Sequence, residues 1–158
     1  MEGWSELYVM AGGAAAALAG LIFVAVSLNS EIILKERSLP GLAIRTLGML
    51  IAVVLLCVFG LIPGQEPWML GLELLILGVV LEGISLQTTL STFVDLTKIS
   101  WRVTRIGSPL LVTVPMILAG VLLLLGMPGA LGWAAVAIAA GFIVGAYEAW
   151  VLLVEIRR

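Results

Sequence analysis

The sequence predicts an all-α integral membrane protein, a single domain over 1–158 with five transmembrane helices, its N-terminus outside and its C-terminus in the cytoplasm. Hydrophobic residues make up 62% of the chain and charged residues 11%, whereas soluble domains average roughly 45–50% and about 25%. Several uncharged runs are long enough to cross the roughly 30 Å of hydrocarbon in a bilayer. The basic residues also fall on one side of a five-span arrangement, which gives the orientation.

The first two helices are expected at about residues 7–30 and 42–62. The first range carries no charge and suffices for one crossing. The polar stretch SEIILKERSLPG follows, in which Pro40 and Gly41 break the apolar pattern. The second range is interrupted only by Arg45. Two spans joined by a short polar connection therefore open the chain.

The third helix is expected at about residues 68–92, directly after the segment PGQEP. Proline and glycine dominate this segment, which is too short to do anything but reverse the chain. The second and third helices are therefore expected to be neighbours. Glu73 and Glu82 interrupt the third apolar run, and its inner end is rich in serine and threonine.

The last two helices are expected at about residues 109–125 and 131–154. The chain has no charge over residues 106–147, a length too great for one crossing, and the sequence GMPG divides this stretch. We expect Ser108 to cap the fourth helix and Pro109 to occupy its first position. A tight outer turn then leads into the fifth helix.

Orientation follows from the positive-inside rule, which assigns basic residues to the cytoplasmic side. These residues lie in the first and third connections and at the C-terminus: Lys35, Arg37, Arg45, Lys98, Arg102, Arg105, Arg157 and Arg158. Tryptophan marks both interfaces of the same arrangement, with Trp4, Trp68 and Trp133 outside and Trp101 and Trp150 inside. The predicted location is the inner (plasma) membrane, as a multi-pass protein.

Three ionisable residues interrupt the predicted spans at a similar depth. From the outer end of each helix, Glu82 lies about 21 Å inside, and Arg45 and Glu148 each lie about 25 Å inside. Each shares a helix face with small residues, which favour close contacts between helices in lipid. We therefore expect these side chains to meet in one layer in the cytoplasmic half of the membrane.

Two interpretations of this layer stay open. A charged group in hydrocarbon costs roughly 2.5–3.5 kcal/mol on insertion scales, so each such group needs a partner or a function. An arginine that pairs with one carboxylate leaves the other to share or exchange a proton, which is typical of an ion or proton pathway. An interhelical ion pair that fixes packing and register accounts for the same residues.

Other polar residues are secondary candidates. Glu73 lies within about 8 Å of the outer surface, and we expect its side chain to reach that interface. Ser85 shares the helix stripe of Glu82, and Asn29, Gln87 and Thr89 gather near the inner ends of their helices. They suit a water-filled vestibule, and helix capping or interhelical hydrogen bonding explains them equally well.

The connection DLTKISWRVTRIG places Lys98, Arg102 and Arg105 on one helical face, beside an apolar face. This pattern predicts a short amphipathic segment on the inner leaflet that binds anionic lipid headgroups. A docking surface for a cytoplasmic partner protein is the alternative.

Composition argues against several functions. Histidine is absent, Cys57 is the single cysteine, and the sequence contains no phosphate loop, metal-ligand cluster or nucleophile elbow. We therefore expect no enzyme, no metal, no cofactor and no nucleic-acid partner. Small-residue stripes on at least three helices predict close helix contacts and a homo-oligomer.

Three segments carry a family resemblance: GGAAAALAGLIFVAVSLNSEIIL, the turn IPGQEP and the closing YEAWVLLVEI. With them the chain resembles a family of small, largely uncharacterised bacterial inner-membrane proteins, some labelled as modulators of the FtsH membrane protease. The resemblance implies a regulatory partner protein and assigns no site residues. Two functions are therefore expected. The three charges at a similar depth favour an ion- or proton-conducting pore or transporter. The resemblance favours a non-catalytic regulatory or scaffolding partner of another membrane protein.

Overall fold

A computed structural model of the chain describes residues 3–35, 39–91 and 99–156. Within these ranges every regular element is an α-helix, and five of the helices are long and apolar enough to span a membrane. The predicted all-helical class with five long helices is confirmed. Beside them the described residues form one short helix in the first connection.

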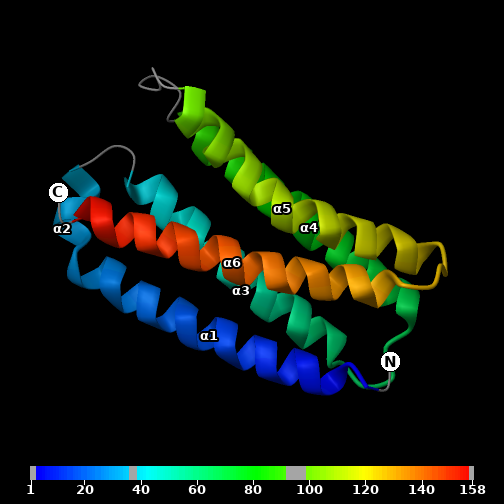
Figure 1. The fold of residues 1–158 in the computed structure, drawn as a ribbon. Coiled ribbons are helices and arrows are strands. Elements are labelled where there is room, and N and C mark those ends of the chain that lie inside the picture. The colour runs from blue at the N-terminus through cyan, green and yellow to red at the C-terminus, as the bar shows by residue number, and fades with distance from the viewer. Residues whose placement is uncertain (1–2, 36–38, 92–98, 157–158) are drawn as a thin grey trace.

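The helices run back and forth along one bundle (Figure 1). Their bounds are α1 Ser5–Leu28, α2 Ser30–Lys35, α3 Leu39–Gly60, α4 Pro67–Ser91, α5 Ile99–Leu124 and α6 Ala130–Ile156. The start of α1 and the α3–α4 and α5–α6 turns lie at one end, and α2 and the C-terminal end of α6 lie at the other (Figure 1). Apart from α5, the long helices begin and end close to the predicted positions.

The start of the fourth long helix was predicted wrongly. Its expected first position is Pro109, capped by Ser108, but α5 begins at Ile99 and holds Pro109 and Pro115 in its interior. A proline removes one amide donor from a helix, and in apolar surroundings hydroxyl side chains and neighbouring helices satisfy the groups that it frees. Ser108 is therefore an interior residue, and its hydroxyl bonds a residue of another helix.

The basic segment before this point belongs in part to the same helix. Residues 99–106 form the first turns of α5 and are continuous with the apolar part of that helix. Lys98 and the side chains of Arg102 and Arg105 lie outside the described residues. Their predicted contacts with anionic headgroups therefore stay predictions.

Helix α3 is the centre of the bundle. It packs against α1, α4 and α6, and α5 packs against α4 and α6. Of the five long helices, α3 is the most buried and α1 the least. The core along α3 is made by Met49, Val53 and Leu56, together with Leu74 of α4 and Met116 of α5. Every long helix except α1 thus packs against at least two other long helices.

Glycines bring α4 and α5 into close contact. A Cβ atom added at Gly71 would lie 2.9 Å from the carbonyl oxygen of Gly120, and one added at Gly120 would lie 2.8 Å from the carbonyl oxygen of Gly71. Further along, a Cβ atom added at Gly78 would lie 2.7 Å from the Ile117 side chain. The small-residue stripe predicted on the third span therefore faces α5, since small residues allow two helices to approach closely.

The turn between α5 and α6 is specified by Gly126, whose φ of 65° favours glycine. The amide of Gly126 donates to the carbonyl of Leu123 at 3.1 Å, and that of Met127 donates to the carbonyl of Leu122 at 2.9 Å. These two bonds form a Schellman motif, which satisfies carbonyls at the helix end. The tight turn predicted at GMPG is confirmed.

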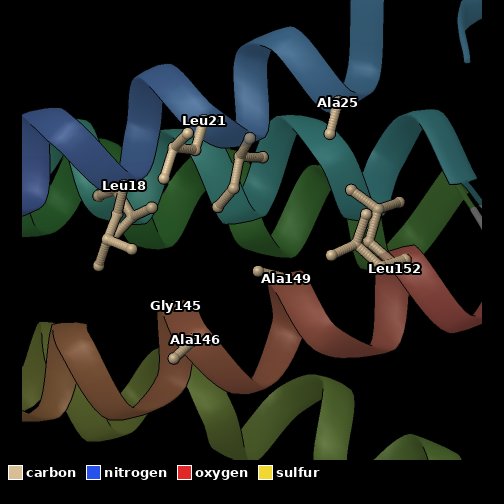
Figure 2. Close-up of a pocket in the computed structure, with 10 residues that line it drawn as sticks. Leu18, Leu21, Ala25, Gly145, Ala146, Ala149 and Leu152 are labelled. Atoms are coloured by element: carbon tan, nitrogen blue, oxygen red, sulfur yellow. The ribbon is translucent and has the colours of Figure 1, made fainter. Parts of the chain in front are cut away.

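An apolar groove of about 230 Å³ lies between α1 and α6 (Figure 2). Aliphatic side chains and glycine line it, among them Leu18, Leu21 and Ala25 of α1 and Ala146, Ala149 and Leu152 of α6. Water would find no polar partner on these walls. Since α1 packs mainly on α3 and makes few contacts with α6, it lies at the edge of the bundle.

Candidate functional site

Arg45 is the basic residue of the candidate site, and α3 positions it. It lies in the second turn of that helix within the apolar sequence LAIRTLGML, and its side chain is 7% exposed. Its Nη2 atom donates to Oε1 of Glu148 on α6 at 2.6 Å. The ion pair therefore joins the central helix to the last helix of the chain.

Glu148 is buried at the meeting point of three helices. Its side chain is 2% exposed, and Ser108 of α5 donates to its Oε1 atom at 2.9 Å. The Oγ1 atom of Thr46 lies 3.5 Å from Oε2 and 2.8 Å from the carbonyl oxygen of Leu42 in its own helix. The carboxylate thus receives a guanidinium and a hydroxyl as close donors, with a second hydroxyl at longer range.

In the cluster of Arg45, Thr46, Ser108 and Glu148, the formal charges of the guanidinium and the carboxylate cancel. A buried ion pair repays the loss of hydration only when its geometry is good and further hydrogen bonds complete it. Both conditions hold for Glu148, which has a short guanidinium contact and a hydroxyl bond on the same oxygen. Removing either charged partner would break a buried ion pair, which costs roughly 3–5 kcal/mol in soluble proteins.

Glu82 occupies a different position, between α4 and α5. Its side chain is partly buried, and its Oε2 atom accepts a hydrogen bond from Thr113 of α5 at 2.8 Å. The same threonine hydroxyl lies 3.1 Å from the carbonyl oxygen of Pro109. Among the described residues, no lysine or arginine lies within ion-pair distance of Glu82.

The structure therefore divides the layer predicted from the sequence. Arg45 and Glu148 meet, whereas Glu82 bonds a threonine and forms no ion pair with a described residue. Helix α5 links the two groups because it supplies both Ser108 and Thr113. These hydroxyls are separated by about 7.5 Å along the helix axis.

Sequence reasoning missed three hydroxyl residues of the site, Thr46, Ser108 and Thr113. Ser108 was assigned to a helix cap that does not exist, because the proline after it suggested a helix start. Threonines within helices usually bond their own backbone, so Thr46 and Thr113 carried no special signal. Both make that intrahelical bond, and both also contact a carboxylate of another helix.

The secondary candidates make mostly local contacts. Glu73 accepts a hydrogen bond from Nε2 of Gln65 at 2.5 Å, beside the α3–α4 turn. Asn29 ends α1, and its Nδ2 atom donates to the carbonyl of Ala25 at 2.8 Å. The capping alternative therefore applies to Asn29, and the Glu73 carboxylate is held by the turn.

The remaining secondary candidates lie toward the inner end of α4. Thr89 is buried and donates to the carbonyl of Ser85 at 2.8 Å. Ser85 is also buried, and Gln87 is exposed. Within the described part of the chain, these contacts stay inside one helix.

The described residues contain no group of three or more His, Cys, Asp or Glu side chains that could hold a metal ion. The chemistry present in the described cluster is that of carboxyl, guanidinium and hydroxyl groups, which donate, accept and transfer protons. No family model, curated protein or solved structure matches the chain, so its function is inferred from these side chains.

Proposed function

We propose that this protein is a multi-pass protein of the inner (plasma) membrane that conducts protons or small ions through its buried polar residues. Its five apolar helices would cross the bilayer with the N-terminus outside and the C-terminus in the cytoplasm. Lys35, exposed at the end of α2, would then lie on the inner side, where basic residues meet anionic headgroups.

The observation that carries the proposal is the ion pair of Arg45 and Glu148 in the interior of the bundle. Ionisable groups within spans are costly, and they commonly mark ion paths and proton relays. Three helices contribute polar atoms to this cluster, and a second carboxyl, Glu82, is held on the fourth. An ion pair that only fixed the packing of two helices would not need these additional polar groups.

Helix α5 provides the connection between the two carboxyls. Ser108 contacts Glu148 and Thr113 contacts Glu82, so both hydroxyls project from one helix toward acidic groups of different helices. Hydroxyl groups donate and accept at once, which allows a proton to pass between neighbours. Waters in the intervening space would complete this route.

Flux through proteoliposomes tests the proposal. The purified protein is reconstituted with a pH-sensitive dye inside, and proton uptake is followed after a membrane potential is applied. We expect flux above that of protein-free vesicles for the wild type, and a return to the protein-free level for E82Q, since glutamine cannot take up and release the proton. E148Q is expected to lose flux as well, because it removes the carboxylate that pairs with Arg45 at one end of the α5 connection.

E73Q is the matched control, because Glu73 lies on the same helix as Glu82 and bonds only Gln65 among the described residues. It should conduct like the wild type. Circular dichroism and size-exclusion chromatography establish that each variant is folded before its flux is compared. Wild-type flux equal to that of empty vesicles, or flux that survives both E82Q and E148Q, rules the pathway out.

A second candidate function is favoured by the exposed face of α1. Gly13, Ala17 and Gly20 are exposed, and a Cβ atom added at either glycine would meet no atom within 4 Å. Small residues allow close approach of another helix in lipid. This face suits a regulatory or scaffolding role in contact with another membrane protein, for example a membrane protease, or with a second copy of the chain.

A further inference from the structure

We infer that Glu82 and Thr113 form the site where the proton is bound and released, and that the Arg45–Glu148 pair is a fixed structural link. The inference rests on the proposed function and assigns different roles to its two acidic groups. It starts from the unequal bonding of the two carboxyls, which the sequence alone gave no means to distinguish.

The two carboxyls differ in the groups that they contact. Glu148 contacts a guanidinium and two hydroxyls, so its negative charge is compensated where it stands. Glu82 contacts one hydroxyl, and no basic group of the described residues lies within ion-pair distance. A proton that reaches Glu82 would not have to displace a guanidinium, whereas one that reaches Glu148 would. Glu82 is thus the group suited to carry a proton.

The hydroxyl of Thr113 has one hydrogen and two acceptors within hydrogen-bond distance. It lies 2.8 Å from Oε2 of Glu82 and 3.1 Å from the carbonyl oxygen of Pro109. When Glu82 is ionised, Thr113 donates to the carboxylate. When Glu82 is protonated, its O–H donates to Thr113 Oγ1, and Thr113 donates to the Pro109 carbonyl.

Both protonation states therefore keep the hydrogen bond between Glu82 and Thr113. The change between them needs only a rotation of one hydroxyl hydrogen, with no movement of heavy atoms. Among the described residues of the helices packed against α4, no charged group forms an ion pair with Glu82. On α3, Arg45 is engaged with Glu148, and on α5 the described neighbour of Glu82 is the uncharged Thr113.

Glu82 is also the more accessible of the two carboxyls. The side chain of Glu82 is partly exposed, and it is bordered on α4 by the exposed residues Val79, Gly83 and Ile84. A Cβ atom added at Gly83 would meet no atom within 4 Å, so the helix surface at the residue after Glu82 is uncovered. Glu148, by contrast, is 2% exposed. An apolar reagent that enters from the bilayer can reach Glu82 and not Glu148.

Labelling with dicyclohexylcarbodiimide, an apolar carbodiimide, tests this assignment directly. The reagent reacts with a protonated carboxyl: the acid proton moves to a carbodiimide nitrogen, and the carboxyl oxygen bonds the central carbon. The resulting O-acylisourea rearranges to an N-acylurea with no leaving group. The labelled peptide therefore gains the mass of one reagent molecule, which peptide mass spectrometry assigns to a residue.

We expect the adduct on Glu82 of the reconstituted wild-type protein and none on Glu148. E82Q should abolish this labelling, and E73Q should leave it unchanged. An adduct on Glu148 with none on Glu82 overturns the inference, as does flux through the wild type without any adduct on Glu82. An adduct on Glu82 in vesicles without flux supports the proton-binding site and refutes the conduction of protons.

A second measurement reports the hydrogen bond to Thr113. Infrared difference spectra in exchangeable buffer should contain the C=O band of a protonated carboxyl, and E82Q should remove it. T113V deletes the hydroxyl at nearly constant shape and should shift that band, whereas T113S keeps the hydroxyl and should leave the band in place. A band unaffected by T113V, or one that persists in E82Q, contradicts the role given to this pair.

Discussion

The ion pair between Arg45 and Glu148 offsets the desolvation cost of burying each charge in the bundle. The guanidinium is always charged, so it cannot avoid the cost of burial by releasing a proton. Its 2.6 Å contact with Glu148 and the hydroxyl bond from Ser108 supply the compensation. The stability of the whole bundle is therefore more sensitive to this pair than to any polar group near the helix ends.

A double substitution distinguishes the loss of one charged partner from the loss of both. We expect E148Q to lower the free energy of unfolding in detergent micelles by roughly 3–5 kcal/mol, since it leaves Arg45 buried without its carboxylate. The double variant R45M/E148L should lose much less stability, because two apolar side chains restore a neutral interior. Denaturant titration followed by circular dichroism measures both values.

E82Q provides the comparison at the other carboxyl. Its amide can donate to Thr113 Oγ1, so the variant should be close to the wild type in stability. Equal destabilisation by E82Q and E148Q, or a double variant that is as unstable as E148Q, would contradict the assignment of one fixed pair and one independent acid.

The close contact between helices α4 and α5 depends on two facing glycines. Gly71 and Gly120 allow the two backbones to approach so closely that a methyl group on either would meet a carbonyl oxygen of the other. This approach also places Thr113 against Glu82. The packing of the helix pair and the geometry of the acidic site are therefore coupled.

G120A should destabilise the protein by about 1–3 kcal/mol, the usual cost of overpacking, since its Cβ atom would lie 2.8 Å from the Gly71 oxygen. G83A is the matched control, because nothing lies within 4 Å of a Cβ atom there and alanine favours a helix. Thermal unfolding in the same detergent compares the two. A G120A protein that melts with the wild type would show that α4 and α5 can separate without cost.

The elements were largely predictable from the sequence, and the reason is the strength of the hydrophobic signal. Uncharged runs separated by polar or glycine-rich turns give each span its limits, and the turn at Gly126 follows directly from its residue types. The error at α5 has a physical cause. Pro109 is typical of a helix start in water, but a helix in lipid can continue through a proline.

The candidate site was predictable only in part. The cost of a charge in hydrocarbon singled out Arg45, Glu82 and Glu148 without any structure. Which carboxylate pairs with the arginine depends on helix rotation and on the α3–α6 contact, and depth along the helices does not contain this information. Thr113 was missed for the same reason, since its role comes from a neighbour on another helix.

The whole molecule is asymmetric: α3, α4, α5 and α6 each pack against two neighbours of this set, and α1 lies at the edge. Buried residues of α1 such as Tyr8, Ala11 and Ala15 face α3, and its glycine-containing face is open. In lipid, packing and polar contacts replace the hydrophobic effect as the force between helices. The open face of α1 is therefore the part of the surface best suited to a second copy.

We expect the wild type to be a homo-oligomer in mild detergent and the variant G13I/G20I to be a smaller species, because isoleucine would keep two α1 helices apart. A14I adds the same side chain to another exposed position of α1 and should leave the oligomer intact. Light scattering coupled to size exclusion gives the mass of each. A monomeric wild type, or equal dissociation by A14I, would exclude this face as the contact.

The guanidinium of Arg45 and its carboxylate are made at different times. Ribosomes deliver a chain from its N-terminus, so α3 is synthesised before α4, α5 and α6, and Glu148 emerges with the last of them. During that interval Arg45 lacks the carboxylate of Glu148, and a charged residue within a span costs roughly 2.5–3.5 kcal/mol on insertion scales. Arrival of α6 supplies that carboxylate. Translation that stops before α6 leaves Arg45 without the ion pair to Glu148, so a truncated chain should be less stable than one that includes α6.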